Sequence, residues 1–526
     1  MSTDHERTET EATIAPEPSP TSSKVNVAAP DGPLLDPAAP VAPSLAGTLC
    51  VPPQHAARTL VLCFDGTGDQ FDSDNSNIVQ LFTMLKKDDR SQQMVYYQAG
   101  IGTYTSPQVA TPLASKISKA MDEAIAWNLD AHVMEGYEFL MQNYTAGDRI
   151  CIFGFSRGAY TARSLAGMIH KVGLLPACNH QQVPFAYKMY TTEDEVGWQQ
   201  SNAFKKAFSI DVDIEFVGVW DTVNSVGLFP RRLPFTTSNT IVKTFRHAVS
   251  LDERRAKFKA NLWNRPNAKE QTLSVSDQAV AQLATVKAKN PQRKESLWAL
   301  ERQYGGVRAQ PTDVEEVWFA GCHCDVGGGS VGNDTKYTLA RIPLRWMIRE
   351  CFKTNSGIMF DPIGLQSIGL EPNKLWPEVL PRPPALAAPS VTIQRIPSNP
   401  TAEDATAREL SLPSYSGDEA HTSNTHLSEE ELDVLDGMSP VYDQLSIAPF
   451  WWALEVFPIK QRRQKGDASW LTSYGFNMGR GRTTPQKLKI HRSVKARLEG
   501  TYEDGGKYVP NAELNVNDLS GVTWVD

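Results

Sequence analysis

The chain has 526 residues, of which 41% are apolar and 21% are charged, and it contains 12 tryptophans. This composition is typical of a folded protein with a sizeable core and argues against a mostly disordered chain. The net charge of -8 argues against the basic surface that nucleic-acid binding requires, so we expect no nucleic-acid partner.

The sequence pattern also bears on location. The first ten residues are polar and lack the basic start and apolar run of a signal peptide. No stretch reaches the run of about 18 apolar residues that a transmembrane helix needs. Two of the seven cysteines, Cys63 and Cys151, lie in strand-like runs, as is typical of buried free thiols in a reducing compartment. We therefore expect a soluble, cytoplasmic protein with neither a signal peptide nor a membrane span.

The amino-terminal region changes character near residue 58. Residues 1–57 hold ten of the 35 prolines, with many Ala, Ser and Thr, and bury too little apolar surface to offset the entropy of ordering. We predict a disordered tail there. The apolar run from Thr59 to Phe64 then indicates a strand buried on both faces.

Strand and helix patterns alternate along the next 260 residues or so. We predict strands at 94–97, 149–153, 213–220 and 314–320, and helices at 125–140 and 159–169. The second helix should end at Gly173, a residue suited to a helix carboxyl cap. This alternation predicts an α/β protein with a mainly parallel, doubly wound sheet.

The strand pattern is interrupted by a basic insertion at about 261–310. Residues 254–308 carry twelve Lys and Arg against four Asp and Glu, which favours solvated helices and loops over an anionic partner. We expect residues 58–375 to form one catalytic domain around this insertion.

The carboxyl-terminal third is expected to form two regions. Residues 380–440 are rich in Pro, Ser and Thr, with ten acidic residues and one arginine between 401 and 436, which predicts a flexible acidic segment. Residues 441–526 should form a helical or irregular segment packed on the catalytic domain. The Trp451-Trp452 stretch predicts a helix packed on the core, where it could cover the active site, with interfacial lipid contact as the alternative.

A Gly-x-Ser-x-Gly motif spans residues 154–158, with Ser156 at its centre. It follows a predicted strand and precedes a predicted helix, the context in which this motif lifts a serine hydroxyl above the sheet on a strained turn. The motif predicts that Ser156 is a nucleophile, and a structural serine in a tight turn is the alternative. It also favours an α/β-hydrolase-like fold with helical insertions and disordered tails.

A serine nucleophile needs a base and an acid that orients the base; in α/β-hydrolases they follow the serine in the order acid, then histidine. Asp221 directly follows the strand predicted at 213–220, at the carboxyl end where parallel sheets place their sites. We predict that Asp221 is the acid of the triad. The alternative is an aspartate that caps the next turn.

Two histidines are candidates for the base. His323 directly follows a predicted strand and precedes the glycine-rich loop 327–329, which leaves room for a substrate, so we predict that it is the base. His247 is the runner-up. Ser250 and Glu253 have capping-box spacing, which places His247 beside a helix start and favours a structural role for it.

Acyl transfer also requires donors for the oxyanion of the tetrahedral intermediate. The backbone N–H of Arg157, at the start of the predicted helix, supplies one, and the loop that contains Gly66 and Thr67 is suited to supply the second and to bind substrate.

Two other chemistries fit less well. The cysteines on either side of His323 suggest zinc, but adjacent residues of an extended chain point in alternate directions and no second ligand pair has the required spacing. Residues 64–67 resemble the aspartate motif of haloacid-dehalogenase-like phosphatases, yet Cys63 stands where that motif needs its nucleophilic aspartate. We expect no metal and no other cofactor.

Six longer motifs occur in order along the chain: FDGTGD (64–69), YYQAGIGT (96–103), GFSRGAYTAR (154–163), VGVWDTVNSVG (217–227), RHAVSLDERR (246–255) and VWFAGCHCDVGGG (317–329). Together they resemble the α/β-hydrolase catalytic domain of type VI secretion phospholipase effectors, a family of fungi and bacteria. The resemblance covers residues 58–375. It implies that Ser156, Asp221 and His323 match the family's triad, and the best-studied bacterial members of that family act as phospholipases.

The leading hypothesis is a serine-dependent carboxylic-ester hydrolase, lipase-like or phospholipase-like, that forms an acyl-enzyme on Ser156. Its expected partners are a lipid or small ester substrate and, transiently, a membrane surface; the sequence identifies no protein partner. The alternative function is a catalytically silent scaffold that retains the hydrolase fold and binds other molecules through its acidic or proline-rich segments.

Overall fold

A computed structural model describes residues 50–100, 129–223, 232–264, 297, 300–301, 311–387, 392–396, 427–464, 470–514 and 521–526. All of them belong to one compact unit, Leu45–Asp526. The predicted tail up to residue 49, most of the basic insertion and residues 397–426 of the acidic segment lie outside the described residues.

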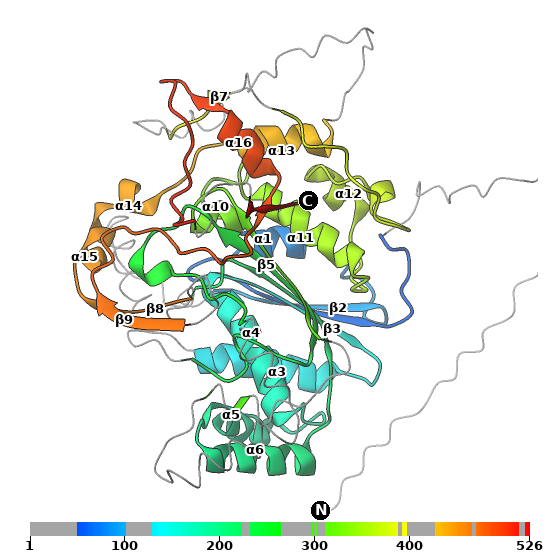
Figure 1. Cartoon of the computed structure of the whole chain (residues 1–526). Helices are drawn as coiled ribbons and strands as arrows, with labels where there is room; N and C mark the ends of the chain where they lie inside the picture. The colour runs from blue at the N-terminus through cyan, green and yellow to red at the C-terminus, as the bar shows by residue number, and fades with distance from the viewer. Residues whose placement is uncertain are drawn as a thin grey trace, which may run out of the picture. The chain divides into compact units, whose positions relative to one another are not determined.

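The centre of the fold is a parallel sheet (Figure 1). Among the described residues it has eight strands, in the order β12-β10-β6-β5-β4-β3-β1-β2. The strands are β1 (Thr59–Phe64), β2 (Gln93–Gln98), β3 (Arg149–Phe155), β4 (Ile214–Trp220), β5 (Val242–Ser250), β6 (Asp313–Phe319), β10 (Lys489–His491) and β12 (Thr523–Val525). The predicted mainly parallel α/β fold is confirmed.

Helices cover both faces of the sheet (Figure 1). Alternate side chains of β1 enter different cores: Leu60 and Leu62 pack on one face, and Val61 and Cys63 pack on the other. The first core is covered by α3 (Leu129–Asn143), α4 (Ser156–Val172), α5 (Val183–Thr191) and α6 (Glu195–Phe208). The second is covered by α1 (Asn77–Thr83), α11 (Arg341–Lys353) and α12 (Pro362–Ser367). Burial on both faces explains the continuous apolar runs in the sequence.

The carboxyl-terminal segment contributes to the main sheet, which the prediction of a helical or irregular segment did not include. Strands β10 and β12 extend the sheet beyond β6 and enclose a third core with α16 (Ser493–Glu499). The segment also contains α14 (Gln444–Ile447), η4 (Pro449–Trp451), α15 (Trp452–Glu455) and the antiparallel pair β8 (Ile459–Gln464) and β9 (Trp470–Gly475). A short parallel pair joins β7 (Thr392–Ile393) to β11 (Thr501–Tyr502).

The end of the predicted flexible acidic segment is a helix, α13 (Glu429–Gly437), so the prediction was wrong for this part. Its acidic side chains are buried against arginines rather than solvated. Arg345 of α11 lies 2.7 Å from carboxylates of both Asp433 and Asp436, and Arg349 of the same helix forms an ion pair with Glu429. Because these arginines neutralise the negative charges, the acidic helix can pack as part of the core.

None of the helices that the structure describes combines the length and the apolar character needed to cross a bilayer.

Gly158 lies where α4 passes over the end of β1. A Cβ atom at this position would lie 2.2 Å from the carbonyl oxygen of Asp65 and 2.3 Å from that of Phe64. Both contacts are with backbone atoms, so a side chain here requires α4 and β1 to separate.

We expect Gly158→Ala to lower the free energy of unfolding by about 1–3 kcal/mol, despite the higher helix propensity of alanine, because it overpacks this contact. Urea unfolding should be compared with Gly475→Ala, where a Cβ meets no atom within 4 Å. Equal midpoints for the two variants would contradict this account of the contact.

Candidate active site

Ser156 stands at the junction of β3 and α4. It is the first residue of α4, and its φ of 58° lies in the left-handed region that residues with a side chain rarely adopt. Such strain is held in place by the packing of the strand and the helix, and it is common at functional sites. The predicted strand, turn and helix around the serine motif are therefore present in the structure.

Asp221 and His323 follow two other strands at the same edge of the sheet. Asp221 comes directly after β4, also with a positive φ of 42°, and its N–H donates to the carbonyl of Ala248 on β5. His323 begins the short helix α10 (His323–Gly327), shortly after the end of β6. The carboxyl ends of three parallel strands thus carry the three predicted triad residues.

The three side chains form a hydrogen-bonded chain. The distance from His323 Nε2 to Ser156 Oγ is 2.7 Å, and that from His323 Nδ1 to Asp221 Oδ2 is 2.5 Å. The aspartate also accepts a bond of 2.8 Å from the N–H of Ser250. With Nδ1 donating to the carboxylate, Nε2 is left as an acceptor for the serine proton.

Aromatic rings enclose the imidazole of His323. The ring centroids of Phe155 and Phe258 lie 4.8 and 4.9 Å from it. Burial lowers the pKa of His323 below its ordinary value, against the opposing effect of the hydrogen bond to Asp221 and of its negative charge. The imidazole is therefore neutral near pH 7, as a general base must be.

Asp221 is ionised although it is fully buried. Burial by itself would raise the pKa of its carboxyl group, but the charge of Arg482 and hydrogen bonds from His323 and Arg482 hold that pKa far below the ordinary value. Arg482 donates to both carboxylate oxygens, at 2.5 and 2.8 Å. The sequence contains no local signal for this arginine, because it lies 261 residues from its partner.

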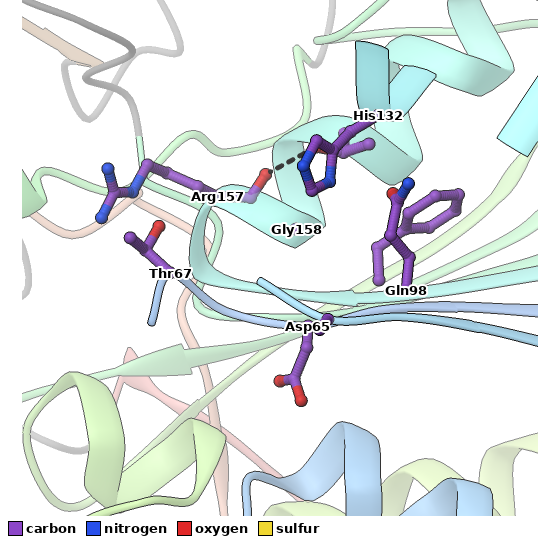
Figure 2. A pocket seen from close by; sticks show the side chains of 9 residues that line it. Asp65, Thr67, Gln98, His132, Arg157 and Gly158 are labelled. Atoms are coloured by element: carbon purple, nitrogen blue, oxygen red, sulfur yellow. Dashed lines mark hydrogen bonds between the residues drawn. The ribbon is translucent and has the colours of Figure 1, made fainter. Parts of the chain in front are cut away.

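Thr67 and Arg157 line one pocket beside the start of α4, with Gln98 and His132 on its other side (Figure 2). Of the three predicted oxyanion residues, Arg157 directly follows Ser156 and shares this pocket with Thr67. Gly66 differs from the other two in its hydrogen bonding. Its N–H donates to Asp65 Oδ1 at 2.8 Å, so in this conformation that N–H is not available to an oxyanion.

The Asp65 carboxylate points away from this pocket (Figure 2). Its oxygens accept hydrogen bonds from Ser76 at 2.6 Å and from Tyr97 at 2.7 Å. These bonds join the loop after β1 to α1 and β2, which is a structural role.

His247, the runner-up base, is not beside a helix start as predicted; it lies within β5. Its ring is fully buried, with Nδ1 at 3.0 Å from Glu316 Oε1 and Nε2 accepting from the N–H of Thr222 at 3.1 Å. Both ring nitrogens thus have partners other than Ser156. The histidine that the structure brings to Ser156 is His323.

The helix predicted at Trp451-Trp452 is present as two short consecutive helices, η4 and α15. Trp451 packs edge-on against Phe258, with ring centroids 5.6 Å apart. Arg255 lies over both rings, with its guanidinium carbon 3.5 Å from the Phe258 centroid and 4.8 Å from that of Trp451. The segment therefore contacts the wall of the site through aromatic side chains.

The parallel sheet and the Ser-His-Asp geometry define an α/β-hydrolase-like protein. Residues 58–350 match the family described as the T6SS phospholipase effector Tle1-like catalytic domain. The chain belongs to this family. Membership in a phospholipase effector family indicates a hydrolase of ester bonds, of the lipase or phospholipase class.

A similar protein is the uncharacterized protein YEL023C of Saccharomyces cerevisiae, which is 28% identical over 551 residues, covering 85% of this chain and 80% of that protein. Two solved structures are also similar. An uncharacterized protein from Pseudomonas aeruginosa has 18% identity and a TM-score of 0.32, covering 61% of this chain and 49% of that one. A Tle1 effector bound to the VgrG spike has 17% identity and a TM-score of 0.25, covering 52% of each chain. The chain thus spans about half the length of both solved proteins.

The lowered pKa of His323 predicts the pH dependence of Ser156 labelling by a fluorophosphonate. The imidazole must be neutral to take the serine proton, and its pKa lies below the ordinary 6.5. Labelling should thus exceed half of its maximal rate at pH 6.5 and decline only as the pH falls through the lowered pKa. Tryptophan fluorescence at each pH controls for acid unfolding. A midpoint above 6.5 would contradict the burial argument.

Proposed function

We propose that this protein is a serine-dependent carboxylic-ester hydrolase of the lipase or phospholipase type, which acts through an acyl-enzyme on Ser156. The observation that carries the proposal is the continuous hydrogen-bonded chain from Ser156 through His323 to Asp221, with distances of 2.7 and 2.5 Å. The strained backbone of Ser156 and the neutral state of His323 support the same chemistry.

The reaction follows from the positions of these atoms. Ser156 Oγ attacks the ester carbonyl carbon while its proton passes to His323 Nε2. Asp221 stabilises the resulting imidazolium through Nδ1 without taking the proton. The tetrahedral intermediate then expels the alcohol, which receives the proton from Nε2. A water molecule, deprotonated by the same nitrogen, hydrolyses the acyl-enzyme and restores Ser156.

We assign stabilisation of the oxyanion to Arg157 and Thr67. The backbone N–H of Arg157 follows the nucleophile at the helix start, as such sites require. The hydroxyl oxygen of Thr67 is buried, and it has no hydrogen-bond partner among the residues that the structure describes. A buried hydroxyl without a partner is costly, and an oxyanion formed on the carbonyl that Ser156 attacks would supply the missing acceptor.

A lipid substrate is supported by exposed apolar side chains close to the site. We call the following six residues of α14, η4, α15 and their neighbours the apolar face: Ile447, Phe450, Val456, Phe457, Phe476 and Met478. Phe457 and Phe476 are 62% and 59% exposed. Phe450 connects the face to the site, because its ring contacts Trp451, Trp451 contacts Phe258, and Phe258 contacts the His323 ring. We propose that the apolar face makes transient contact with a lipid surface.

The nucleophile is tested by Ser156→Ala, which should reduce turnover of p-nitrophenyl esters and of phospholipid vesicles by at least about 1000-fold, because no acyl-enzyme can form. Labelling by a fluorophosphonate should also disappear. Ser164→Ala is the matched control, since Ser164 is a buried serine of the same helix whose hydroxyl donates to the carbonyl of Tyr160. Undiminished turnover in Ser156→Ala would refute the mechanism. Wild-type protein with neither turnover nor labelling would favour the scaffold alternative.

The apolar face is tested by the double variant Phe457→Ser/Phe476→Ser. A buried phenylalanine contributes roughly 1.5–3 kcal/mol, so removing two should weaken binding to phosphatidylcholine vesicles by about tenfold or more. Vesicle hydrolysis should fall with binding, whereas hydrolysis of a soluble short-chain ester should change less than about twofold. Phe208→Ser is the control, because Phe208 is similarly exposed but belongs to α6, far from α15 (Figure 1). An equal loss on both substrates would contradict the lipid-contact role.

A further inference from the structure

Arg482 reaches the active site from the carboxyl-terminal segment, beyond the residues 58–350 that match the family. Its side chain is 2% exposed, and it lies in the chain between β9 and β10. Nη1 and Nη2 donate to the two oxygens of Asp221, at 2.5 and 2.8 Å. This bidentate contact fixes the orientation of the carboxylate more firmly than a single hydrogen bond does.

We infer that Arg482 is a positioning residue of the active site, which holds Asp221 in place and thereby the His323 imidazole. The inference rests on the proposed function, because it assigns the arginine a part in the same triad. Arg482 does not contact the serine; it acts through Asp221.

The guanidinium of Arg482 is itself fixed by backbone groups. Nε and Nη2 donate to the carbonyl of Phe258 at 3.0 and 2.5 Å, and Nη1 donates to that of Ser250 at 3.2 Å. Phe258 is the residue whose ring packs on His323, and the N–H of Ser250 donates to Asp221. The arginine therefore joins the carboxylate to the backbone at Ser250, which also bonds to Asp221, and at Phe258, whose ring packs on the imidazole.

The backbone around Arg482 is also held on both sides. The carbonyl of Arg482 accepts from the N–H of Glu513 at 2.7 Å. Lys259 Nζ donates to the carbonyls of Arg480 and Gly481, at 2.7 and 3.3 Å. The position of the guanidinium is thus set before any substrate binds, as a positioning role requires.

The charges near the imidazole explain what the arginine contributes. Among the described residues, the charged groups with the largest effects on the pKa of His323 or of Asp221 are Asp221, Glu253, Arg255 and Arg482. Glu253 and Arg255 pair with each other at 2.8 Å, which leaves Arg482 as the counter-charge in contact with Asp221. The aspartate therefore shares its charge between His323 and Arg482, which keeps the carboxylate ionised and limits how strongly it stabilises the imidazolium.

The test compares Arg482→Met and Arg482→Lys with wild type and with Arg480→Met, a neighbouring arginine that is 63% exposed and paired with Glu513. Turnover of a soluble p-nitrophenyl ester is measured across the acidic and neutral pH range. Rates are expressed per serine labelled by a fluorophosphonate, so that unfolded protein does not contribute.

Arg482→Met should lower kcat by roughly 10- to 100-fold, by analogy with the loss that follows removal of the hydrogen-bonded partner of a metal-ligating side chain, with little change in KM. Without Arg482, the negative charge of Asp221 should stabilise the His323 imidazolium more strongly than in wild type and raise the pKa of His323. The acidic limb of the kcat/KM profile should therefore move to higher pH. Arg482→Lys restores the positive charge but not the planar guanidinium that bonds both carboxylate oxygens. The acidic limb of its kcat/KM profile should therefore lie nearer to that of wild type, while its kcat stays reduced. Arg480→Met should match wild type.

An Arg482→Met enzyme whose kcat per labelled serine and acidic limb equal those of wild type would overturn the inference. So would a reduced kcat with an unmoved limb, which indicates a structural role alone. If circular dichroism shows that Arg482→Met does not fold, Arg482→Lys decides: a wild-type kcat overturns the inference. Wild-type protein without turnover or labelling would overturn the proposed function and this inference together, whereas an active wild type separates the two.

Discussion

The negative charge of Asp221 lies where water does not reach, and the surrounding structure is arranged to accommodate it. An isolated buried carboxylate costs several kcal/mol, so it persists only with hydrogen bonds and a counter-charge. Here the N–H of Ser250 comes from β5, the imidazole of His323 from α10 and the guanidinium of Arg482 from the carboxyl-terminal segment. Three distant parts of the chain must therefore reach their final positions before this one charge is stable.

The parallel sheet brings these parts together through its register. Phe155, the residue before the nucleophile, pairs with Trp220, the residue before Asp221, and Trp220 pairs with Ala248 of β5. The ends of adjacent parallel strands consequently lie at one edge of the sheet, and the loops that follow them meet there. Positive φ angles at Ser156 and Asp221 then turn both side chains out of the strand direction toward the imidazole.

Local sequence patterns predicted the parts of the fold that depend on local packing. Strands β1, β3, β4 and β6 carry apolar runs because they are buried on both faces, and the serine motif carries its own turn chemistry. Strand β5 was not predicted, because Arg246 and His247 interrupt its apolar run; Glu350 and Glu316 pair with them across the fold. The helix α13 and the role of Arg482 were not predicted either, because their charged side chains are also buried against distant partners. Charge pairs between distant residues leave no periodic signal in the sequence, although they decide which polar segments are buried.

These charge pairs also show why the family-matched residues do not form a self-sufficient unit. Arg345 lies within residues 58–350, yet its carboxylate partners Asp433 and Asp436 belong to α13, and Asp221 depends likewise on Arg482. Breaking a buried pair by removing one partner costs about 3–5 kcal/mol. Two such losses together are comparable to the about 5–15 kcal/mol by which a typical domain is stable. The carboxyl-terminal segment is therefore part of the same folding unit as the triad: it adds β10 and β12 to the sheet, and it carries Arg482, whose backbone is held by Glu513, to Asp221.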